Sequence, residues 1–363
     1  MTAEDWLARV RAGFPYLEGR AYLNSGGAGL AWRGQAAAAA TYYDDVASRG
    51  ADGQRTWMRQ GDRTRQRVAE LLGVPAGDVG FFRNTSEVLN LAANSVDWRP
   101  GDEVVVADDD FPSVVWPWVA AEAAGGRLVR VEPGAEGQRE DRLLAALTPR
   151  TRVLAVSHVH TVTGTRLDLT RLGRACREVG ALLVVDGIQA LGAVPVDLSH
   201  VDVYGSAVFK WLLSGFGTGI GVFRDRAREL LTPAYRGYRN APPSSAFEYA
   251  DPNYPGLYVL DATLAHLEQV GWPRVYRRVD ALAQRVLDAV TAMGRAPATP
   301  ATARAGIVSF RTDDAPAVVG QLLERGVHVV EKKGYVRVSP HFYNSTDDVD
   351  RFAEELRAVL QGR

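Results

Sequence analysis

Lysine is rare in this chain, and one lysine lies where its amine could do covalent chemistry. Only three of the 42 basic residues are lysines. Lys210 lies in the apolar run YGSAVFKWLL, whereas Lys332 and Lys333 are adjacent and precede a glycine, as on a polar turn. Apolar surroundings disfavour the charged form of a lysine, so its amine is more often neutral and nucleophilic. Lys210 is therefore a candidate for a Schiff base with an aldehyde cofactor, the alternative being a lysine that snorkels from a strand edge.

An acidic residue precedes Lys210 by one predicted strand. The run ALLVVD reads as a buried strand that ends in Asp186, and Gln189 follows within one turn. Enzymes that use pyridoxal phosphate need such a pair, because the lysine holds the aldehyde and the carboxylate pairs with the pyridinium nitrogen. The alternative for Asp186 is an ordinary helix cap.

Other polar residues follow predicted strands, and in doubly wound sheets ligands bind at the carboxyl ends of strands. The strand VGFFRN leads to Thr85 and Ser86, whose hydroxyls and helix-start amides either bind a phosphate or simply cap the helix. The strand RVLAVSHV delivers His158, which would stack on a flat cofactor, act as an acid or base, or be structural. Arg337, within the alternating run YVRVSP, would hold a carboxylate through two parallel hydrogen bonds or lie on the surface.

Composition limits the class of protein. The 363 residues carry a formal net charge of −1, which gives no field for attracting nucleic acid or anionic membranes. No apolar run approaches the roughly 18–20 residues that span a bilayer, and the N-terminal residues lack a signal-peptide core. The single cysteine, Cys176, cannot form an internal disulfide. We therefore expect a cytoplasmic protein without nucleic-acid or membrane partners, and we expect no metal site.

The order of predicted elements indicates an α/β fold with two domains. Short Val/Leu-rich runs alternate with helical patterns up to about residue 207, which is typical of a mainly parallel sheet with helices on both faces. Residues 232–256 hold five prolines and predict a long loop and a domain boundary. A helix over 257–293, broken near 271–273, and a compact α+β unit follow. We expect a large cofactor-binding domain over 16–250 and a small C-terminal α+β domain over 251–363, joined by 1–15.

The chain resembles the class V aminotransferase family of fold-type I pyridoxal phosphate enzymes. This family includes cysteine desulfurases, isopenicillin N epimerase-like proteins and some C–S lyases. The similar segments cover nearly the whole chain and are AYLNSGGAG, FFRNTSEVLN, SHVHTVTGT, VVDGIQALGAVPVD, FKWL and VRVSPHFYNSTDDVDRF. The resemblance implies pyridoxal phosphate as cofactor, a large domain with a mainly parallel sheet of the seven-stranded type, and a homodimer in which the loop at 247–256 approaches the partner's cofactor.

The resemblance also implies roles for individual residues. Lys210 would carry the cofactor and then transfer the proton at Cα of an amino acid or amine, while Asp186 would keep the ring nitrogen protonated. Gln189 would bind the phenolic oxygen, His158 would stack on the ring, and Arg337 would bind the substrate α-carboxylate. The further residues expected in the substrate pocket are Asn24, Trp116, His160, His341 and Tyr343.

The expected phosphate site departs from the family pattern. Thr85 and Ser86 match it, and Ser206 would replace one lost contact. The family's Ser-x-His before the lysine is absent, and a threonine that reaches the partner's phosphate is replaced by an acid, so we expect a more weakly held cofactor. The positions of the lost contacts are Ala207, Phe209 and Asp251.

These residues leave the reaction type open. Transamination, Cα epimerisation and β-elimination all begin with the loss of a group at Cα assisted by Lys210. Transamination is the expected reaction because it needs no further residue, and a C–S lyase or an epimerase is the alternative. A protein-persulfide desulfurase is not expected, because Cys176 lies on a predicted helix before the Asp186 strand and not on a C-terminal mobile loop. The lost phosphate contacts favour an alternative of another class, a catalytically inert protein that binds pyridoxal phosphate or another ligand.

Overall fold

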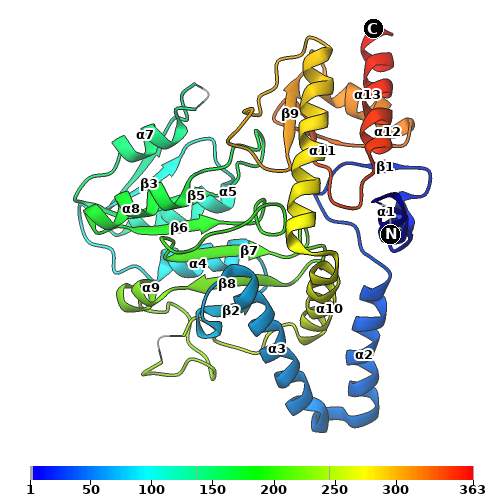
Figure 1. Cartoon of the computed structure of the whole chain (residues 1–363). Coiled ribbons are helices and arrows are strands. Elements are labelled where there is room, and N and C mark those ends of the chain that lie inside the picture. Colours follow the sequence, from blue (N-terminus) through cyan, green and yellow to red (C-terminus); the bar gives the residue numbers. More distant parts are fainter. Residues whose placement is uncertain (1–2, 136, 245, 363) are drawn as a thin grey trace.

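The structure, a computed structural model, describes residues 3–135, 137–244 and 246–362. A seven-stranded sheet forms its centre (Figure 1). The strands of this sheet are β2 (Val79–Phe82), β3 (Glu103–Ala107), β4 (Arg127–Val131), β5 (Thr151–Ser157), β6 (Leu182–Asp186), β7 (Val203–Ala207) and β8 (Gly219–Phe223).

The central sheet is mainly parallel, as the sequence predicts. Its strand order is β2-β8-β7-β6-β5-β3-β4, and only β8 runs antiparallel to its neighbours. Every residue of β3, β6 and β7 is buried. This continuous burial is expected of parallel strands with helices on both faces, and it explains why these strands are apolar runs without polar alternation.

Two hydrophobic cores lie on opposite faces of the sheet, because successive side chains of a strand point to opposite sides. On one face, alternate side chains of β3, β5 and β6 pack against α3 (Gln54–Leu72), α8 (Leu169–Val179) and α10 (Tyr254–Val270). On the other face, the intervening side chains pack against α4 (Thr85–Asn94), α5 (Pro112–Val115) and α6 (Val119–Ala123). None of the described helices combines the length and the apolar character that crossing a membrane requires.

A second, smaller unit is built around a three-stranded antiparallel sheet, ordered β11-β12-β9. The long helix α11 follows α10 after a break at Gly271, and it runs beside this sheet (Figure 1). The elements of this unit are α11 (Trp272–Ala292), β9 (Val308–Arg311), α12 (Ala315–Glu324), β10 (Val327–His328), β11 (Val330–Lys332), β12 (Tyr335–Val338) and α13 (Thr346–Gln361).

The remaining elements lie at the N-terminus or between the strands and helices of the large unit. Strand β1 (Ala21–Tyr22) pairs in parallel with β10. Ala21 and Leu23 are buried in the same core as α11, α12 and α13, although they fall inside the range 16–250 that we expected to form the large domain. The other elements are α1 (Ala3–Ala12), α2 (Gly34–Arg49), α7 (Arg139–Ala145), α9 (Asp225–Leu230) and short 3-10 helices at Pro15–Leu17, Gly50–Gly53, Ala76–Asp78 and Trp116–Trp118.

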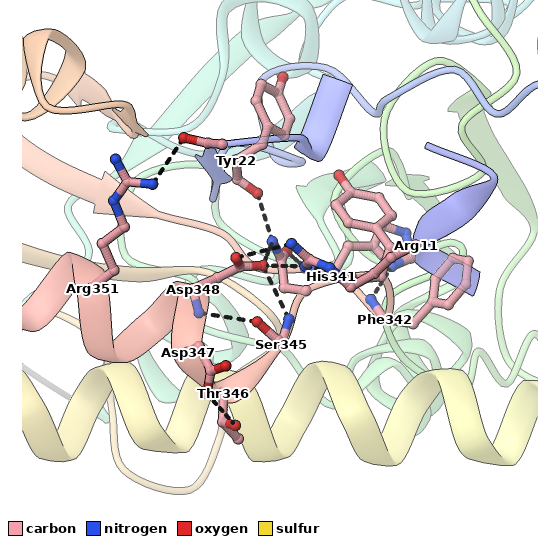
Figure 2. Close-up of polar contacts among 12 residues, drawn as sticks. Arg11, Tyr22, His341, Phe342, Ser345, Thr346, Asp347, Asp348 and Arg351 are labelled. Atoms are coloured by element: carbon pink, nitrogen blue, oxygen red, sulfur yellow. Dashed lines mark hydrogen bonds and ion pairs between the residues drawn. The ribbon is translucent and has the colours of Figure 1, made fainter. Parts of the chain in front are cut away.

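A buried carboxylate ties the N-terminal helix to the C-terminal helix (Figure 2). Asp348 near the start of α13 accepts a 2.6 Å hydrogen bond from Arg11 of α1 and a 2.9 Å bond from Asn344. Asp348 also accepts from the backbone amide of Ser345, whose hydroxyl accepts from the amide of Asp348 in return. This reciprocal capping starts α13 and at the same time fixes α1 against it.

Candidate active site

A cavity of about 130 Å³ lies at the carboxyl ends of β5, β6 and β7. It brings together five residues that the sequence predicts to bind the cofactor, although they come from three separate segments of the chain. Parallel strands end at the same edge of a sheet, so their following residues converge there. These five residues are Thr85, Ser86, Asp186, Gln189 and Lys210.

Lys210 and Asp186 form the charged pair of this cavity. Asp186 is the last residue of β6, and Lys210 follows β7 by three residues. Burial lowers the pKa of the Lys210 amine and raises the pKa of the Asp186 carboxyl, while each charge partly offsets the shift of the other. Asp186 Oδ1 accepts a 2.9 Å hydrogen bond from the backbone amide of Ile188, which fixes the carboxylate in place.

The backbone that carries Lys210 is held by the glycine-rich segment near residue 29. The amide of Gly29 donates to the carbonyl of Phe209 at 2.8 Å. A Cβ atom at Gly29 would lie 2.1 Å from the carbonyl oxygen of Lys210, so only glycine permits this approach. The extended segment AYLNSGGAG therefore supports the lysine from outside the sheet.

A second buried carboxylate, Asp110, organises the cavity wall and was missed by the sequence analysis. Its oxygens accept from the hydroxyl of Ser157 at 2.6 Å, from the amide of Ser157 at 2.9 Å and from the amide of Phe111 at 2.7 Å. These bonds place Ser157 and Phe111 at the cavity. The available signal was the strand VVVA followed by three consecutive acids, an acidic strand end like that of β6.

The start of α4 presents polar groups to the same cavity. Asn84 caps the helix by accepting from the amide of Glu87 at 2.9 Å. The hydroxyl of Thr85 accepts from the amide of Ala207 at 2.8 Å, and the hydroxyl of Ser86 lies 2.7 Å from that of Ser113. The first amides of a helix have no partner within the helix, so this helix start attracts an anion.

Thr161 links the cavity to Arg337. Gln189 Nε2 donates to Thr161 Oγ1 at 3.2 Å, and Arg337 Nη1 donates to the carbonyl and to Oγ1 of Thr161 at 2.8 and 3.2 Å. Trp211 donates to Gln189 Oε1 at 2.9 Å and so fixes the orientation of the amide. The sequence analysis did not single out Thr161, which lies in the matched segment SHVHTVTGT.

Arg337 is a buried cation without a counterion. Its side chain is only 3% exposed, its Nε has no hydrogen-bond partner, and none of the described residues forms an ion pair with it. Burial lowers the pKa of Arg337 to about 10, so the guanidinium remains charged at neutral pH. A buried charge that lacks a partner is costly, and its retention indicates a site for an anion.

His158 and Ser206 do not face this cavity as we expected. His158 lines a different cavity with Arg166 and Asp168, and the hydroxyl of Ser206 donates to the carbonyl of Ala207 at 3.1 Å. The reason in both cases is the alternation of side chains along an extended chain, since the neighbours Ser157 and Ala207 line the Lys210 cavity instead. The aromatic residues that line this cavity are Phe111 and Phe209.

The expected pocket residues His341, Tyr343 and Trp116 are engaged elsewhere. His341 donates from Nε2 to the carbonyl of Trp211 at 2.9 Å and accepts at Nδ1 from the amide of Phe342 at 2.7 Å. Burial lowers the pKa of His341 to about 4, which keeps it neutral. The hydroxyl of Tyr343 lies 2.7 Å from that of Ser25, and Trp116 is 62% exposed.

His160 and Asn24 do not line the Lys210 cavity. The two ring nitrogens of His160 lie 3.0 Å from the Thr163 hydroxyl and 3.3 Å from the Asp109 carbonyl oxygen. Asn24 forms an isolated bridge with Ser339, and its side-chain oxygen is buried without a partner.

The positions where phosphate contacts are lost have distinct surroundings. Ala207 and Phe209 line the cavity, and the ring of Phe209 stacks on Phe216 with centroids 4.2 Å apart. Asp251 lies in another pocket and forms a 3.1 Å ion pair with Arg239. The acid at 251 therefore does not face the cavity of its own chain.

Cys176 is a core residue of α8. Its side chain is fully buried against the sheet, and burial raises the pKa of its thiol to about 12. A thiol with such a pKa is almost wholly protonated at neutral pH and is a poor nucleophile.

Comparison with known proteins agrees with this architecture. A protein named "Probable cysteine desulfurase" from Aeropyrum pernix is 31% identical over 341 residues, covering 82% of each protein. The isopenicillin N epimerase of Amycolatopsis lactamdurans is 30% identical over 336 residues, covering 81% of this chain and 84% of the epimerase.

Two solved structures of C-DES have the same fold. One is a mutant with glycine covalently linked to the PLP cofactor, with a TM-score of 0.89 and 23% identity over 95% of this chain and 98% of that one. The other is the cystine C–S lyase C-DES in complex with cysteine persulfide, with a TM-score of 0.87 and 24% identity over 94% and 98% of the two chains. The family model described as aminotransferase class-V matches residues 22–352. The chain therefore belongs to the aminotransferase class-V family of pyridoxal phosphate-dependent enzymes.

Proposed function

We propose that the protein acts at Cα of an α-amino acid with pyridoxal phosphate as its cofactor, and that its reaction is transamination. The observation that carries this proposal is the buried pair Lys210 and Asp186 in one cavity, together with Arg337, which has no counterion and donates to Thr161 of the cavity wall. Pyridoxal phosphate supplies an aldehyde that takes up an amine and a ring that withdraws electrons from Cα.

The residues of the cavity fit the parts of this cofactor. The Lys210 amine is the group that would hold the aldehyde, and its lowered pKa favours the neutral, nucleophilic form. Asp186 uses Oδ1 to bind the amide of Ile188, and among the described residues none donates to Oδ2, which leaves that oxygen for the ring nitrogen. We assign the stacking role to Phe111 in place of His158, because Phe111 lines the cavity and the other aromatic residue there, Phe209, already stacks on Phe216.

The phosphate would lie at the start of α4. The amides of Thr85 and Ser86 have no partner within the helix, and the hydroxyl of Ser86 adds a donor. Ala207 and Phe209 supply no hydrogen-bond donor from their side chains, so these helix-start groups carry most of the binding within one chain. We therefore retain the expectation of a weakly held cofactor.

Arg337 would bind the α-carboxylate of the substrate. It is charged, buried and unpaired, and its bonds to Thr161 leave the Nε atom free. Through Thr161 and Gln189 the guanidinium is connected to the residues around Asp186, so the carboxylate would be held at a fixed place relative to the cofactor.

Lys210 is the group that would move the proton at Cα. Epimerisation needs a second base on the opposite face, and the two candidates, His160 and Tyr343, already bind protein groups. Burial also lowers the pKa of His160 and raises that of Tyr343, so neither is suited to exchange a proton near neutral pH. These contacts favour transamination over epimerisation.

A C–S lyase reaction is the second candidate, and the structural likeness to the cystine C–S lyase C-DES is the observation that favours it. It would release its sulfur product without a protein persulfide, because Cys176, the one cysteine of the chain, is buried in α8. A persulfide detected on Cys176 after incubation with cysteine would contradict this assignment.

The test is to incubate the holoenzyme with a panel of amino acids in deuterated water. Transamination yields one equivalent of keto acid without an acceptor and converts the cofactor to its aminated form. Elimination yields keto acid catalytically together with a thiol or sulfide, and epimerisation yields inverted amino acid with deuterium at Cα. Absence of any exchange, keto acid or spectral change across the panel would overturn the enzyme proposal and favour an inert binding protein.

We also propose that the protein is a homodimer. Large aromatic side chains are exposed on the loop between β7 and β8 and on the loop that follows α9, among them Phe216 (74%) and Tyr238 (70%). Exposed aromatic side chains are enriched at protein interfaces. Light scattering coupled to size-exclusion chromatography should give twice the chain mass, and a monomer would contradict the proposal.

A further inference from the structure

We propose that the substrate carries a second anionic group at the end of its side chain, and that Lys332 binds this group. The inference rests on the proposed function, since it places the α-carboxylate on Arg337. It assigns the substrate to the α-amino acids with an acidic side chain.

The register of the small sheet places Lys332 and Arg337 on one face. In the antiparallel pair of β11 and β12, Val330 lies opposite Arg337 and Lys332 lies opposite Tyr335. Directly opposed residues project to the same side, and so do residues two apart on one strand. Lys332 and Arg337 are therefore diagonal neighbours, whose Cα atoms are typically about 7–8 Å apart.

This shared face points toward the Lys210 cavity. Ser309 of β9, which lies opposite Arg337, donates to the carbonyl of Val162 at 2.5 Å, and Arg337 donates to the carbonyl of Thr161 at 2.8 Å. The opposite face of the same sheet is apolar and packs against α12 and α13 through Val308, Phe310, Val336 and Val338. Lys332 is thus on the same polar side of the small sheet as Arg337.

The hairpin tip fixes where Lys332 lies while leaving its amine free. The turn between β11 and β12 consists of Lys333 and Gly334, both with positive φ (52° and 81°), which is the two-residue turn that suits a twisted hairpin. Lys333 Nζ donates to the carbonyl of Asp109 at 3.1 Å and so holds the tip against the large domain. Among the described residues, none forms a hydrogen bond or an ion pair with the side chain of Lys332.

The charges around this position favour an anion. Lys332 and Arg337 both act to lower the pKa of Lys210, which agrees with their lying within electrostatic reach of its amine. The carboxylates at the hairpin tip already have partners, because Asp109 is paired with Arg139 at 2.6 Å and Glu331 accepts from the amide of Gly334. A substrate with two anionic ends would therefore meet two cations with no other counterion, whereas a neutral side chain would leave Lys332 unpaired.

The first test is binding of unreactive acids to the holoenzyme, measured by calorimetry. Succinate has two carboxylates, and butyrate has one on a chain of the same length. We expect succinate to bind about 10- to 100-fold more tightly, and we expect Lys332→Met to remove this preference by weakening succinate alone. Lys332→Arg should keep the preference. The matched control is Lys333→Met, because the amine of Lys333 already donates to the carbonyl of Asp109. This variant should change the binding of both ligands equally or leave both unchanged.

Equal binding of succinate and butyrate to the wild type, or an unchanged preference in Lys332→Met, would overturn the inference. The second test compares kcat/KM for aspartate and glutamate with that for asparagine and glutamine. A preference for the acids that Lys332→Met abolishes supports the inference, and turnover that favours the amides contradicts it while leaving the proposed function intact. Turnover of none of the four, combined with a Lys332-dependent preference for succinate, contradicts the proposed reaction and leaves the anionic subsite standing.

Discussion

Two buried groups of charged residues in this molecule are built in opposite ways. Around Asp348, the carboxylate accepts from Arg11, Asn344 and Ser345, so the charge is satisfied by the protein itself (Figure 2). Around Lys210, by contrast, Arg337 keeps a buried nitrogen without a partner and no described residue pairs with it. The contrast teaches that a satisfied buried charge holds structure together, whereas an unsatisfied one indicates a place for a ligand.

The largest effect is expected at Lys210. Lys210→Ala should lower turnover by at least about 1000-fold, because it removes both the covalent anchor and the proton-transfer group. The free energy of unfolding should not fall, since a buried amine is removed. Borohydride reduction and peptide mapping of the wild type should place the cofactor on the peptide that contains Lys210. A label on Lys332 or Lys333 would refute the assignment.

Replacing Arg337 should weaken substrate binding without lowering the stability of the protein. Arg337→Met should weaken binding of the amino acid by about 2–5 kcal/mol, through loss of a buried charged pair with its carboxylate. Because the guanidinium has no counterion in the protein, the variant should unfold no more easily than the wild type. Inhibition by the corresponding decarboxylated amine should be unchanged. A normal KM in the variant would show that the substrate carboxylate lies elsewhere.

Replacing Asp348 should lower stability without changing activity, the reverse of what is expected for Arg337. Asp348→Ala leaves Arg11, Asn344 and the start of α13 without their acceptor, and we expect a loss of about 2–4 kcal/mol of unfolding free energy with kcat and KM unchanged. Denaturant unfolding measures the loss. The control is Asp347→Ala, an exposed neighbour that should change stability by less than about 0.5 kcal/mol. Equal losses of unfolding free energy in the two variants would show that the bonds of Asp348 do not stabilise the fold.

Burial of His341 should make the free energy of unfolding depend on pH. Its pKa is lowered to about 4 by burial, against about 6.5 in the unfolded chain. Stability from this residue is therefore complete above pH 6.5 and is lost as the pH falls toward 4, by about 2 kcal/mol between pH 7 and pH 5. His341→Gln should lower stability at pH 7 but reduce its dependence on pH over this interval. An unchanged pH slope would mean that the ring protonates without unfolding the surrounding core.

The sequence predicts the fold class and the position of Asp186 and Lys210 at one edge of the sheet, because both follow from local sequence patterns. Apolar runs predict buried parallel strands, and an acid or amine directly after such a run must lie at the ligand-binding edge, as Asp186 and Lys210 do. The break between α10 and α11 also follows from Gly271 and the proline at 273.

What the sequence does not predict is which side of a strand end a residue faces. His158 and Ser206 were one position away from Ser157 and Ala207, and a shift of one residue reverses the face. His341 and Tyr343 lie in a matched segment, but their partners Trp211 and Ser25 are distant in the chain. Such pairings depend on packing between elements and cannot be derived from local pattern.

The bond between Arg11 and Asp348 has a consequence for how the protein is made. Its two residues are 337 positions apart, so the N-terminal helix leaves the ribosome long before its acceptor exists. At synthesis rates of about 5–20 residues per second, this interval lasts roughly 20–70 seconds. During it, Arg11 lacks its acceptor Asp348 and β1 lacks its partner β10, whereas the central sheet can already assemble. Helix α1 is therefore among the last elements to reach its native place, and chaperones that bind exposed apolar segments would meet it throughout that time.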